Sequence, residues 1–111
     1  MRVLAEPEVI EYLEELVTIL YEKGYFGYEE DAQYYVDELI DDIIAYLPIK
    51  SSKPAPKHFK KYGKDLKYAS FKKNRQTSWY VFFEVYKENT EIFYLIKHIE
   101  NNHTLAQYLE P

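Results

Sequence analysis

The sequence contains no cysteine. Disulfide bonds, thiolate metal ligands and cysteine nucleophiles are therefore all excluded. A chain without cysteine suits a reducing compartment, and we expect this protein to be cytoplasmic. Histidine is also scarce, with three residues, and none of them is spaced from carboxylates in a way that is typical of metal ligands. We therefore expect no metal and no other cofactor.

Glycine is equally rare, with three residues that are not clustered. A glycine-rich phosphate loop is thus excluded, and the chain has no nucleophile elbow, so ATP-driven and serine-hydrolase chemistry are not expected. No stretch approaches the roughly 18 consecutive apolar residues that a membrane helix needs. The N-terminal residues turn acidic at Glu6 and do not resemble a signal peptide.

The chain does contain enough apolar and aromatic residues for one folded core. It has 111 residues, of which 47% are hydrophobic and 18% are aromatic. Disordered chains are poor in aromatic residues, and a chain of this length can bury one core but not two. We therefore predict a single domain over residues 1–111.

The charges are divided unequally along the chain. Residues 1–47 hold thirteen acids and two bases, whereas residues 48–111 hold six acids and twelve bases. Most of the bases lie in residues 50–75, which carry nine lysines, one arginine and a single acid. This asymmetry indicates a polyanion or an acidic partner on the basic side. The alternative is a solvated lysine-rich loop that binds nothing specific.

Hydrophobic periodicity predicts two amphipathic helices in the acidic part of the chain. Residues 2–5 form a short apolar strand, and Pro7 suits the first turn of a helix that ends near Lys23. Acids at Glu29–Asp31 open a second helix, which Pro48 ends. Because the connection between the helices is short, we expect them to pack as an antiparallel hairpin.

The residues that follow the second helix indicate an irregular connector. Pro54 and Pro56 argue against regular structure in residues 48–63, and serine and glycine residues in the same segment agree with them. We expect this connector to be mobile, basic and on the surface.

The remaining residues predict three antiparallel strands and a short C-terminal helix. Alternating patterns place the strands at residues 65–72, 77–86 and 92–99, and the helix at residues 103–109. The fold class is therefore α+β: an N-terminal strand, an α-helical hairpin and a three-stranded antiparallel meander packed on one sheet, in the order β-α-α-β-β-β. Both helices are expected on one face of the sheet, which leaves the other face open.

This order of elements resembles the RelE/ParE superfamily, the toxins of type II toxin–antitoxin systems. Three stretches carry the resemblance over nearly the whole chain. Residues 7–13 are similar to the start of the family's first helix, residues 79–83 to its aromatic third strand, and residues 92–103 to its last strand and polar exit.

The resemblance implies one of two toxic actions that arrest growth, both silenced by a cognate antitoxin protein. RelE-like members are mRNA interferases, endoribonucleases that cleave mRNA on the ribosome at a 2′-hydroxyl without a metal. ParE-like members inhibit DNA gyrase without catalysis. A degenerate member that keeps only antitoxin binding is a third alternative. Of these alternatives, we expect the RelE-like action. We expect no membrane partner, and the sequence leaves the oligomeric state open.

Cleavage at a 2′-hydroxyl needs a base, a cation and an acid around the phosphate. The resemblance gives three candidate catalytic residues, Arg75, His103 and Tyr108, and four candidate nucleic-acid-binding residues, Lys67, Lys72, Lys73 and Arg75. An arginine can also hold a phosphate with two parallel hydrogen bonds.

Two departures from the family pattern favour the gyrase alternative. The family's third strand often carries an arginine after its first aromatic residue, where this chain has Tyr80. The exit of the last strand is often rich in arginine, where this chain has Asn101–His103. His98, inside the last strand, is predicted to be a structural, hydrogen-bonded histidine.

Overall fold

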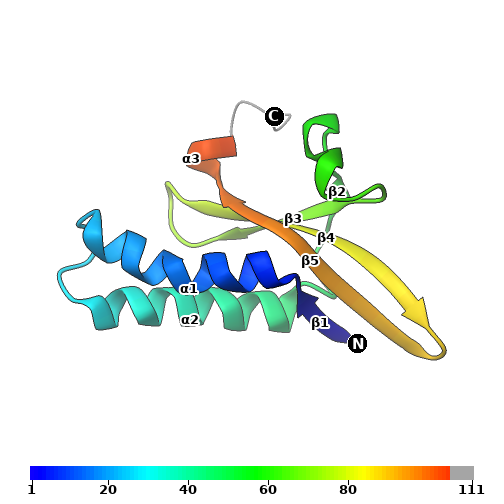
Figure 1. The fold of residues 1–111 in the computed structure, drawn as a ribbon, viewed down its shortest axis with the longest axis horizontal. Helices are drawn as coiled ribbons and strands as arrows, with labels where there is room; N and C mark the ends of the chain where they lie inside the picture. The colour runs from blue at the N-terminus through cyan, green and yellow to red at the C-terminus, as the bar shows by residue number, and fades with distance from the viewer. Residues whose placement is uncertain (106–111) are drawn as a thin grey trace.

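The computed structural model describes residues 1–105 and consists of a helical layer packed on a five-stranded sheet (Figure 1). The predicted α+β class, with its strand, helical hairpin and antiparallel meander, is confirmed. A short strand and a 3-10 helix that were not predicted lie between the helical hairpin and the meander. The elements are β1 (Arg2–Ala5), α1 (Pro7–Glu22), α2 (Glu29–Tyr46), β2 (Lys53–Pro54), the 3-10 helix η1 (Lys57–Tyr62), β3 (Lys67–Lys72), β4 (Ser78–Glu88), β5 (Glu91–Asn101) and α3 (Asn102–Leu105).

Both long helices begin and end close to where the sequence predicts. α1 begins at Pro7, and Glu8 lies in its first turn near the positive end of the helix dipole. Gly24 follows α1 with a φ of 79°, a left-handed conformation that glycine adopts without steric cost. α2 ends at Tyr46, just before Pro48. The two helices lie side by side and antiparallel (Figure 1).

The sheet has the strand order β1-β5-β4-β3-β2. β1 pairs with β5 in parallel, with Arg2 opposite Phe93, and the other neighbours are antiparallel. β4 and β5 have eleven residues each, and only Asn89 and Thr90 separate them, so both strands run further into the turn than the predicted residues 77–86 and 92–99. Asn89 has a φ of 57°, the left-handed conformation that a two-residue hairpin turn demands.

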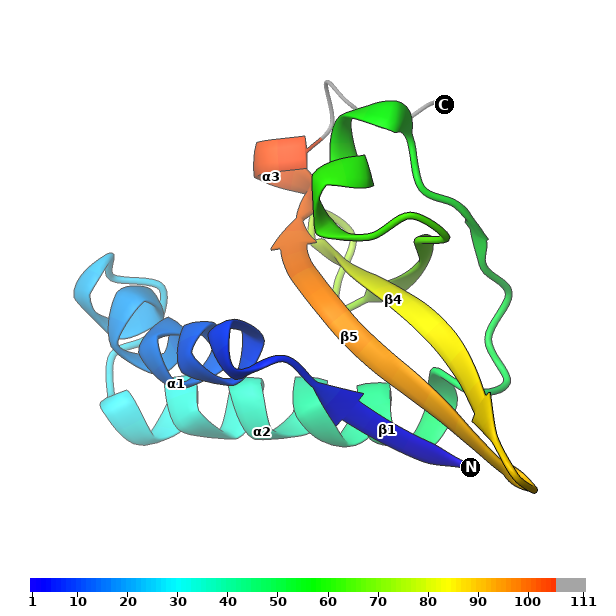
Figure 2. The same cartoon turned by 45° about the vertical axis from the view of Figure 1, so that its right-hand side comes forward.

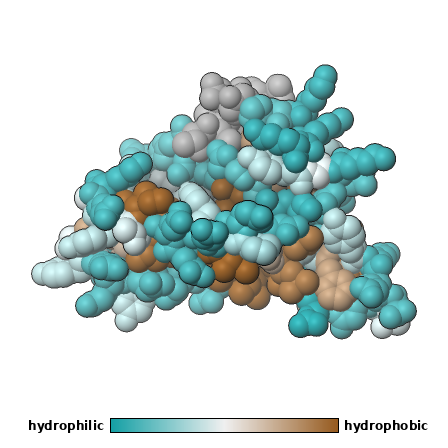
Figure 3. Space-filling view, in the orientation of Figure 1, coloured by the Kyte–Doolittle hydropathy of each residue, from teal (hydrophilic) through white to brown (hydrophobic). Residues whose placement is uncertain are grey.

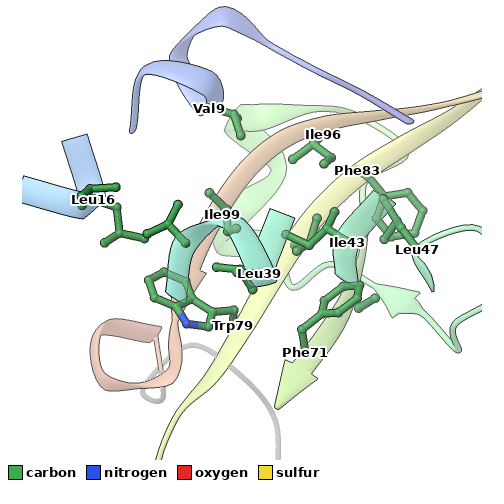
Figure 4. Packing of buried hydrophobic residues seen from close by; sticks show 14 of the residues in the cluster. Val9, Leu16, Leu39, Ile43, Leu47, Phe71, Trp79, Phe83, Ile96 and Ile99 are labelled. Carbon is green, nitrogen blue, oxygen red and sulfur yellow. The ribbon is translucent and has the colours of Figure 1, made fainter. Parts of the chain in front are cut away.

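The main core lies between the helices and the sheet (Figure 4). Trp79, Val81 and Phe83 alternate along β4 and face the helices, as the strand period predicts. Removing this apolar surface from water is the main favourable contribution to folding. The helical side of the core is built from Val9, Leu16, Val17, Ala32, Val36, Leu39, Ile43 and Leu47.

The connector after α2 contains a short strand and a 3-10 helix, so the prediction of an irregular segment is wrong. It adds β2 to one edge of the sheet and then forms η1 on the face opposite the helices (Figure 2). Phe59 of η1 is 1% exposed and stacks on Phe82 with 4.4 Å between ring centroids. Phe82 faces away from the helices and needs an apolar cover. The expectation of an open sheet face is therefore wrong where η1 lies.

A bulge interrupts the pairing of β4 with β5. Phe82 pairs with His98 whereas Phe83 pairs with Ile96, so Lys97 is the extra residue on β5. Because of this extra residue, both Ile96 and Ile99 belong to the main core. Beyond β5, α3 begins the predicted C-terminal helix, and the rest of that prediction lies outside the described residues.

Candidate functional site

A network of polar side chains joins the turn between β3 and β4 to the end of β5. Within the turn, Asn74 Oδ1 accepts hydrogen bonds from the backbone N–H groups of Gln76 and Thr77, both at 2.9 Å. Asparagine is favoured in such turns because its side chain satisfies backbone donors two and three residues ahead. The turn is thus held in one shape by its own sequence.

Two asparagines at the end of β5 make side-chain hydrogen bonds, and one of them, Asn102, attaches the strand to the same turn. Asn102 Oδ1 accepts a hydrogen bond from Ser78 N at 2.9 Å, and its amide nitrogen donates to Gln76 O at 3.1 Å. Asn101 Oδ1 accepts a hydrogen bond from His103 N at 2.9 Å. The sequence shows these asparagines as the end of a strand, but not that Asn102 binds a turn 24 to 26 residues away.

His103 lies directly over this turn. Its Nε2 atom is 3.3 Å from Thr77 Oγ1, and its side chain is exposed. The hydroxyl of Thr77 can donate to or accept from an imidazole nitrogen, so the direction of this hydrogen bond depends on the tautomer of the ring. Thr77 is a functional candidate that the sequence alone did not single out.

Lys73 provides a positive charge at the start of the same turn. Its Nζ atom is 3.3 Å from Glu38 Oε2 and 4.9 Å from the centroid of the Tyr35 ring. The Tyr35 hydroxyl accepts a hydrogen bond from Trp79 Nε1 at 2.9 Å, so the ring is itself fixed to the core. The Glu38 side chain is 74% exposed, and an ion pair with so exposed a partner is weak. An incoming anion can therefore replace Glu38 on Lys73.

Lys73 and His103 line one cleft of about 740 Å³ between the helical hairpin and the β3–β4 turn. Aromatic rings form much of its wall, and polar groups lie at the turn. The aromatic residues are Tyr12, Tyr25, Phe26, Tyr35 and Trp79, and the polar ones include Lys23, Glu38, Asn74, Thr77 and Asn101. A cavity of this size, with an aromatic wall and polar groups gathered at the turn, suits a small planar ligand or a nucleotide.

The structure brings some of the predicted site residues together and separates others. Arg75 is exposed in the same turn as Lys73, and Lys72 is the exposed last residue of β3. Lys67 is the first residue of β3, which puts it about 17 Å from Lys72 along the strand, at ~3.3 Å per residue. Tyr108 lies outside the described residues.

A second cleft, of about 470 Å³, meets the first at Tyr12 and Asn101, which line both. His98 lies in it, with Nε2 hydrogen-bonded to Glu100 Oε1 and its ring stacked on Tyr62 at 4.0 Å. The predicted hydrogen-bonded character of His98 is thus confirmed. Burial, and then the nearby charge of Glu100, raise the pKa of Tyr12, so this phenol stays neutral and can donate a hydrogen bond.

A cluster of charged side chains lies around the bulge of β5, next to the second cleft. Glu84 Oε1 accepts a hydrogen bond from the Tyr86 hydroxyl at 2.7 Å, and Glu84 Oε2 accepts one from Asp65 N at 3.2 Å. These bonds and Lys97 lower the pKa of Glu84 although burial opposes them. A hydrogen bond to Glu6, at 3.2 Å, raises the pKa of Lys97. The cluster ties the start of α1, β4 and β5 to the segment between η1 and β3.

Within residues 1–105, no group of three histidine, cysteine, aspartate or glutamate side chains is arranged to hold a metal ion. In the same part of the chain, no helix combines the length and the apolar character required to cross a membrane. Comparisons with protein-family models, with curated proteins and with solved structures found no match to this chain.

Proposed function

We propose that this chain is the toxin of a type II toxin–antitoxin pair and that it cleaves RNA at a 2′-hydroxyl without a metal. The observation that carries the proposal is the meeting of His103, Thr77 and Lys73 in one aromatic-walled cleft. The family resemblance names Lys73 and His103 as candidate site residues, and Thr77 joins them in the structure, so an imidazole and a cation line the same cleft. A cognate antitoxin is the expected partner.

The cleft contains groups for each part of this reaction. If Nε2 of His103 is protonated and donates a hydrogen bond to Thr77 Oγ1, Nδ1 of the same ring keeps its lone pair. Nδ1 then accepts the proton of the 2′-hydroxyl. The 2′ oxygen then attacks the neighbouring phosphorus and the bond from phosphorus to the 5′ oxygen breaks. The products are a 2′,3′-cyclic phosphate and a 5′-hydroxyl.

Charge at the phosphorus is balanced by cations on the β3–β4 side. Lys73 is fixed at the wall of the cleft, and Arg75 and Lys72 are exposed beside it. Cations placed where negative charge develops lower the barrier more than cations that must first move there. The proton for the leaving 5′ oxygen is assigned to Tyr108 by the family resemblance alone.

The aromatic wall explains how a single strand of RNA would be held. Bases that are not paired stack on aromatic side chains, and sequence-specific proteins use this on single-stranded RNA. Tyr25 is 69% exposed at the mouth of the cleft, and Phe26 and Tyr35 contact each other behind it, with 5.5 Å between ring centroids. A base can therefore enter beside Lys73 without disturbing the buried Trp79.

The test is controlled induction of the chain in bacteria, with the RNA ends then mapped. We expect growth arrest and new RNA fragments with 5′-hydroxyl ends. His103→Ala should abolish both, since losing an acid–base group costs about 10²–10⁴-fold in rate. His58→Ala is the matched control, because this histidine lies exposed on η1 and does not line the cleft.

Other outcomes would replace the proposal. Growth arrest that persists in His103→Ala, together with loss of DNA supercoiling and intact RNA, would assign the chain to gyrase inhibition. Unimpeded growth with folded protein in the cell would leave only antitoxin binding. Relief of arrest by a co-expressed small protein would identify the antitoxin in either toxic case.

A further inference from the structure

An apolar groove of about 760 Å³ runs between β1, α1 and α2. Thirteen of the sixteen residues that line it are apolar. Leu4, Ile10 and Ile44 come from three different elements and remain 43%, 48% and 55% exposed. Figure 3 shows the resulting hydrophobic surface in the middle of this face, surrounded by hydrophilic residues. Contiguous exposed aliphatic side chains with a polar rim mark interaction sites on soluble proteins.

The rim of this groove is acidic. Glu14 of α1 and Asp37 of α2 are two of its three polar residues, and the third, Gln33, donates a hydrogen bond to Asp37 at 2.9 Å. The chain around them is acidic as well, since residues 1–47 carry thirteen acids and two bases. Charged groups that a partner places along this rim must therefore be basic, because like charges across an interface cost free energy.

The shape of the groove suits a helix. Its walls are two antiparallel helices that present Ile10 and Leu13 on one side and Ile40 and Ile44 on the other. A helix laid in such a groove inserts apolar side chains spaced at three and four residues, and its outer face keeps its charges in water. The exposed aliphatic residues follow the same spacing, so the two patterns can interdigitate.

We infer that the groove formed by Leu4, Ile10, Leu13, Ile40 and Ile44 binds a lysine- or arginine-rich amphipathic helix of a second protein. Two other occupants fit the charges less well. RNA is repelled by the acidic rim. A second copy related by two-fold symmetry would set one acidic rim against another. The inference does not rest on the proposed RNA cleavage, and its test contains no RNA.

The test is a selection from displayed helical peptides of about 18 residues, which span ~27 Å. The library fixes leucines at three- and four-residue spacing and allows any residue at the polar positions. We expect lysine and arginine to be enriched at those positions. The selected peptides should bind the full chain with micromolar dissociation constants that rise with salt, and the double variant Ile10→Asp/Ile44→Asp should bind at least tenfold more weakly.

Tyr34→Asp is the matched control, because Tyr34 is an exposed apolar residue of α2 that does not line the groove. It should bind as the unchanged chain does. The inference is overturned if no peptide is selected, if the selected peptides lack a basic bias, or if they bind the double variant equally well. Sedimentation that shows a dimer which the double variant abolishes would overturn it too, and would assign the groove to a second copy.

Discussion

Glu84 is the residue at which charge and packing are most closely combined. It is 9% exposed, and it accepts hydrogen bonds from the Tyr86 hydroxyl and from the backbone of Asp65. The nearby Gly63 is required by this arrangement, since a Cβ atom at that position would lie 2.9 Å from Glu84 Cδ. Glu84 therefore holds the connector against the sheet through contacts that only its ionised form makes fully.

We predict that Glu84→Gln lowers the free energy of unfolding by about 1–3 kcal/mol at neutral pH, the cost of mispaired buried donors. The folded-state pKa of Glu84 lies below its usual 4.5, so its stabilisation is present above that value and is lost as the pH falls through the lower, folded pKa. Urea unfolding of both proteins from pH 7 to pH 3 measures this. The free energies of unfolding of Glu84→Gln and of the unchanged chain should converge at the acidic end of this pH range.

Glu88→Gln is the control for this prediction. Glu88 is an exposed carboxylate near the end of the same strand, so its substitution should leave the pH dependence unchanged. A difference in the free energy of unfolding between Glu84→Gln and the unchanged chain that stays constant over the whole pH range would contradict the prediction. It would show that the ionisation of Glu84 does not contribute to stability.

At the scale of elements, the connector is the part of the fold that departs furthest from the sequence-based expectation. The helices and the meander were predictable because apolar residues repeat with the period of each element. In the connector, Phe59 is one aromatic residue among lysines, and a single residue has no period. Its partner Phe82 sits in a strand with apolar residues on both faces, so the sequence alone left open what covers the second face.

We predict that Phe59→Ala destabilises the protein by about 3–5 kcal/mol, as for other large buried aromatic residues. The physical reason is the loss of an almost fully buried ring that stacks on Phe82 and closes the second core. Thermal and urea unfolding measure the change. Amide hydrogen exchange should also show faster opening of η1 than of α1.

His58→Ala, one residue away and exposed, is the comparison and should cost less than about 0.5 kcal/mol. If Phe59→Ala were as mild as that control, the connector would not be anchored by its aromatic residue.

The candidate site was predictable to a similar degree. The family resemblance named Lys73 and His103, and the structure places both in one cleft. The sequence could not give the Asn102 bonds that join the two segments, because they depend on how β4 and β5 are registered. It also could not give the bulge at Lys97, because an extra residue in a strand is not visible in the alternation of residues.

At the scale of the whole molecule, charge and architecture coincide. The two long helices carry nearly all of the acids of the first 47 residues, whereas the basic residues 50–75 form the connector, β3 and the following turn. The molecule therefore has an acidic helical layer and a basic edge of the sheet. RNA bound to such a molecule should lie along the basic edge and should reach the helical layer only at the aromatic wall of the cleft.

We predict that RNA containing 4-thiouridine cross-links to residues 50–75 and to the end of β5, and not to the outer faces of α1 and α2. Mass spectrometry of the cross-linked peptides makes this measurement. Lys72→Glu should weaken binding severalfold more than Lys67→Glu, because Lys72 adjoins the turn that holds Lys73 whereas Lys67 lies at the other end of β3. Equal effects of the two substitutions would argue for diffuse attraction instead of a defined site.

The pairing of the first strand with the last has a consequence for how the protein is made. β1 lies in the first five residues, and its partner in the sheet begins near Phe93, so this edge cannot form while a ribosome is still adding the last strand. His103 joins its turn even later in synthesis. Contacts between residues this distant in sequence also form slowly. A nascent chain therefore carries a helical hairpin and an incomplete sheet until β5 has been made, and the cleft is assembled only after His103 has been added.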